Sequence, residues 1–400
     1  MSDFHQHGPI TTIHRLGNPD PLKLQRELEA LPEKARPVLV LPCHARELGS
    51  TALRRIASEL RKTKFLRHIV VGLDGADARS AARAVKFSRT IGENTTVLWN
   101  DGPRVQSLLA EMERRRLRPG PPGKGRNLRL CLGWFLACTD APCVAIHDCD
   151  IANYDRGMLV RLCYPVAARG MGFEVAKAFS ARFSTRLDGR AMRLLAAPLL
   201  RAFSAMEGFG ENTRALEFLR YPLSGEVCLS RRIAARLELP SDWGVETAMV
   251  ADAFRLCGPR RICQVDIAES HNHRHQSLSE KNPSAGLNKM GADIALCLLR
   301  TSARGPQKPA AANIGKLLRE FRREALRLLD SYSADARMNL LEYDRALELR
   351  TVGLFARCIR RAAGEYLASP GIPAGTPAWN AVWRRYPGIR KMFLETASNP

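Results

Sequence analysis

The sequence lacks any hydrophobic run of the roughly 20 residues that an α-helix needs to span a bilayer. Its first residues, which include Asp3, His5 and His7, also lack the pattern of a secretory signal peptide. The 11 cysteines form no CxxC pair, so neither a zinc ribbon nor a dithiol redox site is expected. Unpaired thiols are typical of a reducing compartment, and we therefore expect a cytoplasmic protein without a membrane span.

Aromatic residues are also scarce, at 6% of the chain, although the net charge is +22. Proteins that bind single-stranded nucleic acid usually combine a basic groove with aromatic side chains on which bases stack. Here basic runs such as residues 114–116 have no aromatic neighbours. The charge thus favours small anions such as phosphates and nucleotides, and no nucleic-acid partner is expected. A non-catalytic, basic nucleic-acid-binding protein is retained only as an alternative.

The pattern of apolar residues predicts the fold class. Short apolar runs at 37–41, 68–73, 96–99 and 143–146 alternate with helix-compatible stretches such as 51–61. This alternation predicts βαβ units, and hence an α/β fold with a mainly parallel sheet flanked by helices. Ligands of such sheets bind beyond the carboxyl ends of the strands, where each of these runs ends in polar or conformationally special residues.

Composition changes near residue 302 and marks a second part of the chain. Residues 302–309 are rich in small residues, glycine and proline, which predicts a linker. Beyond it, apolar residues at helical spacing from Ile314 to Leu328 predict an amphipathic helix. We therefore expect four segments: an N-terminal extension (1–35), a main domain (36–300), a linker (301–313) and a helical C-terminal region (314–400).

An acidic pair follows the apolar run 143–146 directly, in the segment His147-Asp148-Cys149-Asp150. Two carboxylates one residue apart at a strand end can present oxygens to a hard cation, which can also hold a diphosphate. A DxD pair alone is often only a polar strand end. Upstream, the loop Pro122-Gly123-Lys124-Gly125-Arg126 combines glycines with two cations but does not match the P-loop pattern. Together, the loop and the acidic pair predict a site for a metal diphosphate.

A histidine-rich segment offers a further metal ligand. His271, His273 and His275 account for three of the nine histidines and fall within five residues. Neutral imidazole is a competent metal ligand and would complete a site begun by the carboxylates. A solvated loop is the alternative, and the residues alone do not distinguish among the three histidines.

Three polar loops lie between these motifs. Residues 221–226 and 242–247 each place a carboxylate, Glu226 and Glu246, close to glycine. Such segments can bring a carboxylate against sugar hydroxyls, or can serve simply as a turn and helix cap. In the loop at 186–190, Arg190 can bind an acceptor phosphate or carboxylate bidentately, with a surface ion pair as the alternative.

Taken together, these motifs resemble the glucosyl-3-phosphoglycerate synthases over residues 37–300. The resemblance rests on Leu41-Pro42, Gly72-Leu73-Asp74, Gly123-Lys124-Gly125, Asp148-Cys149-Asp150, Ser224-Gly225-Glu226, Trp243-Gly244-Val245-Glu246 and the segment from His273 to Leu278. It implies a GT-A fold, in which a nucleotide-sugar half (36–155) and an acceptor half (156–300) share one sheet. It also implies a homodimer.

The resemblance implies a metal-dependent, retaining transfer of glucose from UDP-glucose or GDP-glucose to 3-phosphoglycerate, toward glucosylglycerate or a polysaccharide precursor. Two alternatives stay open: a mannosyl-3-phosphoglycerate synthase that uses GDP-mannose, and a sugar nucleotidyltransferase. Comparing the turnover of the sugar nucleotides would distinguish the mannosyl alternative from the glucosyl one. Pyrophosphate release without sugar transfer would indicate a nucleotidyltransferase.

The resemblance also implies a role for individual residues. Mg²⁺ or Mn²⁺ would be held by Asp148, Asp150 and His273. The donor would contact Pro42, Cys43, His44, Glu47, Asp74, Lys124, Asp148 and Glu226. The acceptor would contact Gly189, Arg190, Ser224, Gly225 and Arg274, and the catalytic residues would be Glu246, Lys124 and Asp150. Met192 stands where that family has a threonine, so one phosphate contact is expected to be missing.

Overall fold

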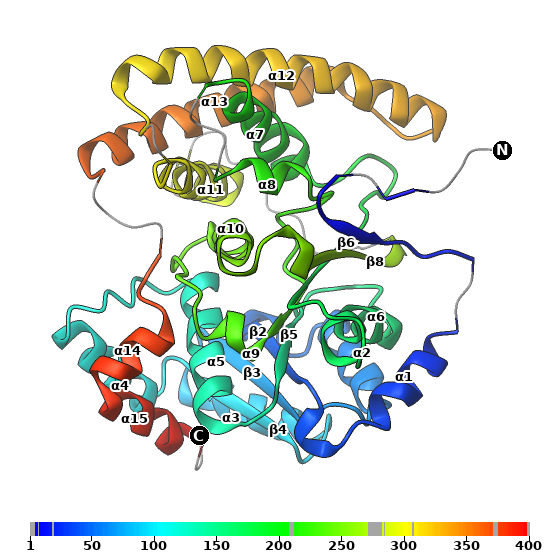
Figure 1. The fold of residues 1–400 in the computed structure, drawn as a ribbon, viewed down its shortest axis with the longest axis vertical. Helices are drawn as coiled ribbons and strands as arrows, with labels where there is room; N and C mark the ends of the chain where they lie inside the picture. Colours follow the sequence, from blue (N-terminus) through cyan, green and yellow to red (C-terminus); the bar gives the residue numbers. More distant parts are fainter. Residues whose placement is uncertain are drawn as a thin grey trace.

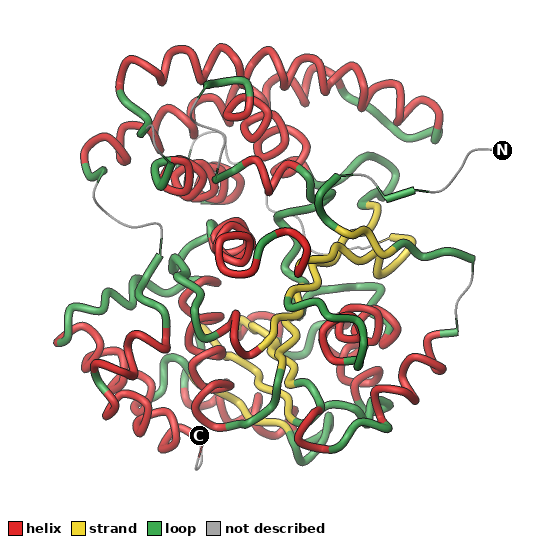
Figure 2. Tube along the Cα trace, viewed as in Figure 1, coloured by secondary structure: helices red, strands yellow, loops and turns green. Residues whose placement is uncertain are grey.

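The computed structural model describes residues 5–6, 8–17, 20–207, 212–270, 282–283, 285–305, 308–370 and 375–397. At its centre is an eight-stranded sheet with the order β1-β8-β6-β7-β5-β2-β3-β4 (Figures 1 and 2). The strands are β1 (Thr11–Ile13), β2 (Val38–His44), β3 (His68–Asp74), β4 (Thr95–Trp99), β5 (Cys143–Ile146), β6 (Val175–Ala181), β7 (Val227–Ser230) and β8 (Ile262–Ser270). Strand β7 runs antiparallel to β5 and β6, and the other pairs are parallel, which confirms the expected fold class.

The four apolar runs expected as strands form β2, β3, β4 and β5. Strand β2 continues to His44, beyond its expected end, because it keeps pairing with β3 until His44 lies beside Asp74. The carboxyl ends of these parallel strands therefore meet at one edge of the sheet. Strands β1, β6, β7 and β8 were not predicted. Polar residues such as Lys177 in β6 and Gln264 in β8 interrupt their apolar pattern, although both side chains are buried.

Helices cover both faces of the sheet because side chains alternate along each strand. Leu39 and Leu41 point into one core, and Val38 and Val40 point into the other. The first core is closed by α1 (Pro21–Glu29), α2 (Thr51–Leu60), α3 (Ala78–Ser88) and α6 (Arg156–Ala167). The second, larger core includes α4 (Pro103–Arg114), α5 (Lys124–Cys138), α7 (Ala197–Ser204), α8 (Arg214–Glu217), α9 (Arg231–Ala234), α10 (Val245–Cys257) and α11 (Gly286–Ser302).

The C-terminal region is helical, as expected, and packs against the rest of the chain in two places (Figure 1). It consists of α12 (Ala311–Met338), α13 (Arg345–Ala368), α14 (Trp379–Arg385) and α15 (Pro387–Ala397). Helices α12 and α13 pack on α7 and α11, whereas α15 packs on α4 and α5. The indole N–H of Trp379 donates to the carbonyl oxygen of Arg129 in α5 at 2.9 Å. The division of the chain into domains stays a prediction.

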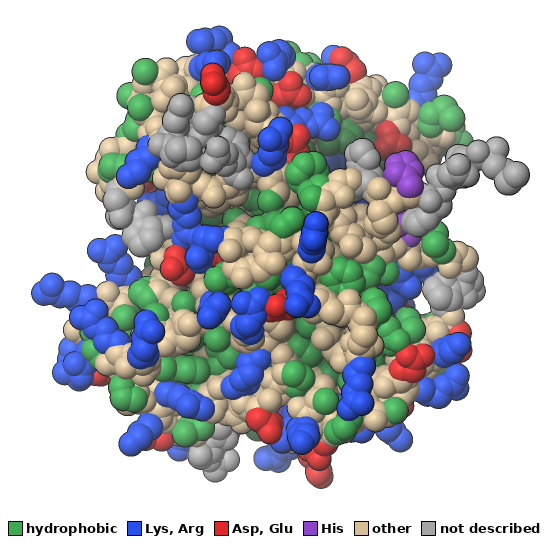
Figure 3. All heavy atoms as spheres, in the orientation of Figure 1, with side chains coloured by type: hydrophobic (Ala, Val, Ile, Leu, Met, Phe, Trp, Pro, Cys, Tyr) green, Lys and Arg blue, Asp and Glu red, His purple; other side chains and the backbone are tan. Residues whose placement is uncertain are grey.

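Within the described part of the chain, no helix has both the length and the apolar character needed to cross a membrane. On the face shown in Figure 3, lysine and arginine side chains are spread widely over the surface.

Candidate functional site

A cleft of about 650 Å³ opens beyond the carboxyl ends of β2, β3 and β5. The cleft therefore lies at the edge of the sheet where the sequence predicted a ligand site. Its lining includes these predicted site residues: Pro42, Cys43, His44, Glu47, Asp74, Lys124, Asp148, Asp150, Gly189, Arg190, Gly225 and Glu246. Folding thus brings motifs that are far apart in the sequence, from Pro42 to Glu246, into one cavity.

Lys124, the first residue of α5, links the two halves of the cleft. Its Nζ lies 2.7 Å from Oδ1 of Asp148, which follows β5, and 2.8 Å from Oε1 of Glu246, in the first turn of α10. Burial by itself would lower the pKa of Lys124, but the two carboxylates raise it well above its usual value. Lys124 is therefore a fixed positive charge in the cleft, and it connects the two acidic motifs.

Two glycines permit this close packing. A Cβ atom at Gly125 would lie 2.1 Å from the carbonyl oxygen of Pro240, so a side chain there would push α5 away from the segment that leads into α10. A Cβ atom at Gly225 would lie 2.4 Å from Oδ2 of Asp148. Both distances are shorter than real contacts allow. Glycine is therefore required where the backbone approaches the carboxylate and the helix start.

Asp150 sits in a group of carboxylates whose charges repel one another. Burial, together with the charge of Asp148, raises the pKa of Asp150 to about 6, and Glu226 and Glu47 add to this effect while Lys124 opposes it. Oxygen ligands with excess negative charge fit a hard divalent cation such as Mg²⁺ or Mn²⁺.

The predicted third metal ligand cannot be placed. His273 lies outside the described residues, as do His271, Arg274 and His275. Among the residues that are described, no three His, Cys, Asp or Glu side chains are grouped to hold an ion.

Polar groups at the ends of β2 and β3 form the wall where the nucleotide was expected. Asp74, at the end of β3, is buried and accepts a hydrogen bond from Nδ2 of Asn100 at 2.9 Å. Burial raises the pKa of the Asp74 carboxyl. Glu47 accepts a hydrogen bond from Nε of Arg46 at 3.2 Å. Both carboxylates can accept hydrogen bonds from the hydroxyl or N–H groups of a ligand.

Ser224 and Glu226 lie beneath the cleft and do not line it. The Ser224 hydroxyl donates to Oε2 of Glu226 at 2.6 Å, and both residues are buried.

Sequence reasoning missed Lys177, whose buried Nζ donates to the carbonyl oxygen of Ser224. Burial lowers the pKa of Lys177 to about 8, against the opposite effect of Glu246 and Glu226. A lone lysine inside the apolar strand β6 was the signal that could have revealed it.

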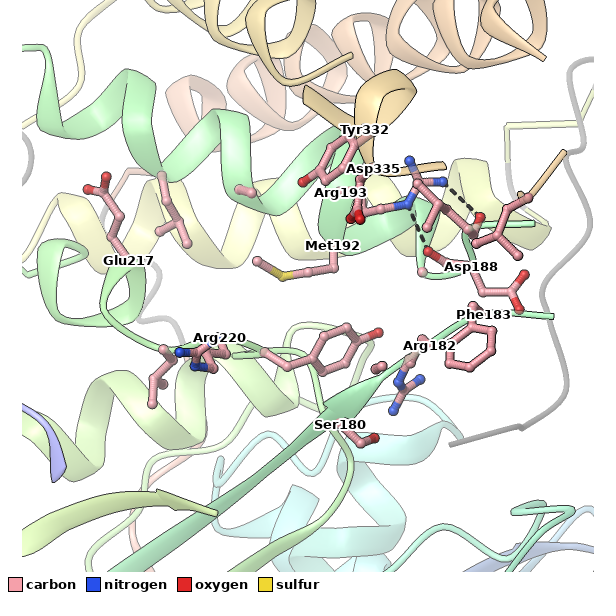
Figure 4. A pocket seen from close by; sticks show the side chains of 18 of the residues that line it. Ser180, Arg182, Phe183, Asp188, Met192, Arg193, Glu217, Arg220, Tyr332 and Asp335 are labelled. Carbon is pink, nitrogen blue, oxygen red and sulfur yellow. Dashed lines mark hydrogen bonds between the residues drawn. The ribbon is translucent and has the colours of Figure 1, made fainter. Parts of the chain in front are cut away.

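Gly189 and Arg190, which the resemblance assigns to the acceptor, line the cleft together with residues that were not predicted. The guanidinium group of Arg182 lies 4.3 Å from the ring centre of Tyr221, and both residues line the cleft. Met192, in contrast, lines an adjoining second pocket (Figure 4). The position expected to lack a phosphate contact therefore faces away from the cleft.

Comparison with known proteins finds sequence relatives, two of which match nearly the whole chain, although no family model matches it. The chain is 35% identical over 395 residues to the glucosyl-3-phosphoglycerate synthase of Persephonella marina, covering 98% of each chain. It is 28% identical over 398 residues to that of Methanococcoides burtonii, covering 98% of this chain and 96% of the relative.

Solved structures of the glucosyl-3-phosphoglycerate synthase of Mycobacterium tuberculosis are similar in fold. One, in complex with Mn²⁺, UDP and glucosyl-3-phosphoglycerate, aligns with a TM-score of 0.53 at 23% identity, covering 76% of this chain and 90% of that one. Another, with Mn²⁺, UDP-glucose and phosphoglyceric acid, gives a TM-score of 0.53 at 23% identity, covering 76% and 89%. At this identity the likeness shows a shared fold.

Proposed function

The chain belongs to the glucosyl-3-phosphoglycerate synthase family, and we propose on this basis that it transfers glucose from a nucleoside diphosphate glucose to 3-phosphoglycerate. The resemblance stated from the sequence is confirmed. One observation of the structure carries the proposal: Lys124 bridges Asp148 and Glu246 in a cleft that also contains Arg190. A fixed cation, a carboxylate cluster and an arginine are the groups needed to bind a diphosphate donor and an anionic acceptor together.

Asp148 and Asp150, with His273 outside the described residues, would hold Mg²⁺ or Mn²⁺. The raised pKa of Asp150 supports this, because it reports repulsion among buried carboxylates. A divalent cation bound among them would offset that repulsion and stabilise their charged forms. When bound, the ion would offset the charge that develops on the departing nucleoside diphosphate. Structures of the M. tuberculosis relative contain Mn²⁺ or Mg²⁺ together with UDP.

The donor would lie along the ends of β2 and β3, and the acceptor along the loop that contains Arg190. Pro42, Cys43, His44, Glu47 and Asp74 would contact the nucleotide, as their place in the cleft lining supports. Gly225 and the buried Ser224 and Glu226 would shape the sugar-binding floor. Arg190, with Gly189 and Arg274, would bind the acceptor phosphate and carboxylate, since a guanidinium group matches both geometrically. The net charge of +22 would favour the approach of both anions.

The chemical step we propose is attack by the acceptor hydroxyl on the same face of the sugar that the nucleoside diphosphate leaves. Lys124 lies between the metal-site carboxylate of Asp148 and the catalytic carboxylate of Glu246, so its charge can stabilise the leaving phosphate. The departing phosphate oxygen would take the proton of the acceptor hydroxyl. Holding both substrates in one cleft would supply much of the rate enhancement through positioning.

The proposal is tested by nucleoside diphosphate release from UDP-glucose, GDP-glucose and GDP-mannose, with and without 3-phosphoglycerate and Mn²⁺, followed by mass analysis. We expect release that requires both acceptor and metal, with a glucosyl-phosphoglycerate product. Asp150→Asn should abolish it, whereas Asp140→Asn, at an exposed carboxylate before β5, should not. Exclusive use of GDP-mannose would contradict the glucose assignment, and pyrophosphate release from a sugar phosphate and a nucleoside triphosphate would indicate a nucleotidyltransferase.

We also propose a homodimer formed through the C-terminal helices. Large apolar side chains are exposed on α12 and the turn after it, with Leu326 at 45%, Met338 at 83% and Leu340 at 93% exposure. A second copy of the chain packed on this region would bury these apolar side chains. Light scattering should give a dimer mass for the wild type and a monomer mass for Met338→Asp combined with Leu340→Asp. A monomeric wild type would contradict the proposal.

We further propose a cytoplasmic location. It is supported by the 11 cysteines, all of which are free thiols and most of which are buried. Thiols persist in compartments kept reducing by glutathione or thioredoxin. Fractionation of cells that express the protein would test this, and recovery with the envelope fraction would contradict it.

A further inference from the structure

The loop at residues 182–191 joins β6 to the short helical turn η3 (Met192–Ala196) and contains Arg190. One side of this loop lines the cleft, and the other lines the second pocket, of about 760 Å³. Figure 4 shows Tyr332 and Met192 across that pocket from Arg182 and Arg220. Residues 183–186 of the loop are exposed, so its position depends strongly on the polar contacts at its other end.

Several of those contacts are made by Arg193, which lies in η3 two residues after the loop (Figure 4). Its Nε donates to the carbonyl oxygen of Asp188 at 2.8 Å, and its Nη2 donates to that of Leu187 at 3.0 Å. The same guanidinium group is bound by Glu348 of α13, with Nη1 to Oε2 at 2.6 Å and Nη2 to Oε1 at 3.2 Å. Glu348 therefore orients the side chain that holds the loop backbone.

Glu348 also contacts Arg190 itself. The Nε of Arg190 lies 3.4 Å from Oε1 of Glu348, whose side chain is only 7% exposed. Within the described part of the chain, Nη1 and Nη2 of Arg190 make no hydrogen bond, and its side chain is 21% exposed. The Nε contact thus fixes the guanidinium group while its two Nη groups stay able to bind an anion bidentately.

We infer that Glu348 is a positioning residue for the acceptor, through which the C-terminal helix α13 sets the geometry of Arg190. The inference rests on the proposed function, because it assumes that 3-phosphoglycerate binds at Arg190. The single carboxylate of Glu348 is shared by two guanidinium groups, those of Arg190 and Arg193, so these three side chains together keep a net positive charge. An acceptor that carries a phosphate and a carboxylate requires such a charge. A second contact ties the loop to the same region: the backbone N–H of Glu342 donates to the carbonyl oxygen of Thr185 at 2.9 Å.

Glu348→Gln keeps the shape of the side chain and removes the charge that orders both guanidinium groups. We expect the acceptor KM to rise about 10- to 100-fold, because charge-assisted hydrogen bonds that fix the binding side chain are lost. The donor KM, and kcat at saturating acceptor, should stay within about twofold of the wild type. Glu348→Asp should recover part of the effect. Glu365→Gln, at a position on the same helix whose side chain is 60% exposed, is the matched control and should leave both KM values unchanged.

Amide hydrogen exchange across residues 182–191 gives a readout that does not depend on turnover. Exchange should be faster in Glu348→Gln and unchanged in Glu365→Gln. Absence of transfer by the wild type would overturn the proposed function. With an active wild type, unchanged exchange and an unchanged acceptor KM in Glu348→Gln would overturn the positioning role alone.

Equal rises in the donor and acceptor KM values would also overturn the positioning role, since a general loss of structure produces that result. If Glu348→Gln does not fold, Arg193→Lys is the test variant instead, because it keeps the positive charge but loses the bidentate contact with Glu348. An unchanged acceptor KM in a folded Arg193→Lys protein would overturn the inference.

Discussion

Replacing Lys124 with methionine should reveal how strongly the carboxylates of the cleft depend on one cation. The ammonium group lies 2.7 Å from Asp148 and 2.8 Å from Glu246, and the Lys124 side chain is only 16% exposed. Removing one partner of such a buried pair leaves an uncompensated buried charge, which costs about 3–5 kcal/mol. We therefore expect the free energy of unfolding of Lys124→Met to fall by about 3 kcal/mol, the lower end of that range because some exposure remains.

Urea unfolding followed by circular dichroism, without metal or nucleotide, measures this loss of stability. Lys86→Met, at an exposed lysine of α3, is the control and should change the midpoint little. In a double-mutant cycle, Lys124→Met and Glu246→Gln should be less than additive, with a coupling of about 1–3 kcal/mol. Transfer by Lys124→Met should be slower by a factor of about 10²–10³. An unchanged urea midpoint at pH 7, or additive effects in the cycle, would refute the reasoning.

Three further predictions concern the same floor of the cleft. Burial and the charge of Asp148 raise the pKa of Asp150 to about 6, so at lower pH Mn²⁺ must displace a proton from this carboxyl. The Mn²⁺-induced rise in melting temperature should therefore be smaller at pH 5 than at pH 7. Equal rises at the two pH values would count against the metal assignment. Gly225→Ala should lower transfer more than about tenfold and should also lower the melting temperature, because its Cβ would displace the Asp148 carboxylate from Lys124; Gly353→Ala, where nothing lies within 4 Å, is the control. Burial lowers the pKa of Lys177 to about 8, below its ordinary 10.5, so its ionised form weakens the fold at neutral pH; the wild type should gain stability relative to Lys177→Met as the pH rises from 8 to 10, and parallel urea midpoints across this range would exclude the effect.

Local sequence patterns determined the central part of the fold. The apolar runs that became β2, β3, β4 and β5 are short, continuous and bounded by polar residues, so each could be recognised without knowledge of its neighbours. The acidic pair could be placed at the end of β5 for the same reason. Strand β7 could not be predicted in this way, because its four residues have no distinctive pattern and its antiparallel place between β5 and β6 depends on pairing.

The residues expected to contact ligands were recognised as candidates, but their connections were decided by the tertiary structure. The sequence identified Lys124, Asp148, Glu246 and Arg190 as separate motifs, because their types and local settings suit a phosphate-binding site. That Lys124 joins Asp148 and Glu246 depends on how α5 and α10 pack.

Glu348 was not identified at all, because it lies in a helix whose pattern is that of an ordinary amphipathic segment. It is separated from Arg193 by 155 positions in the chain, and only the packing of α13 against η3 brings the two together. Lys177 was missed for a related reason, since a lysine within a strand carries no local sign of the carbonyl group that it will meet. Pattern in a sequence reports interactions between near neighbours, whereas a charge buried by distant segments acquires its partner only when the chain is folded.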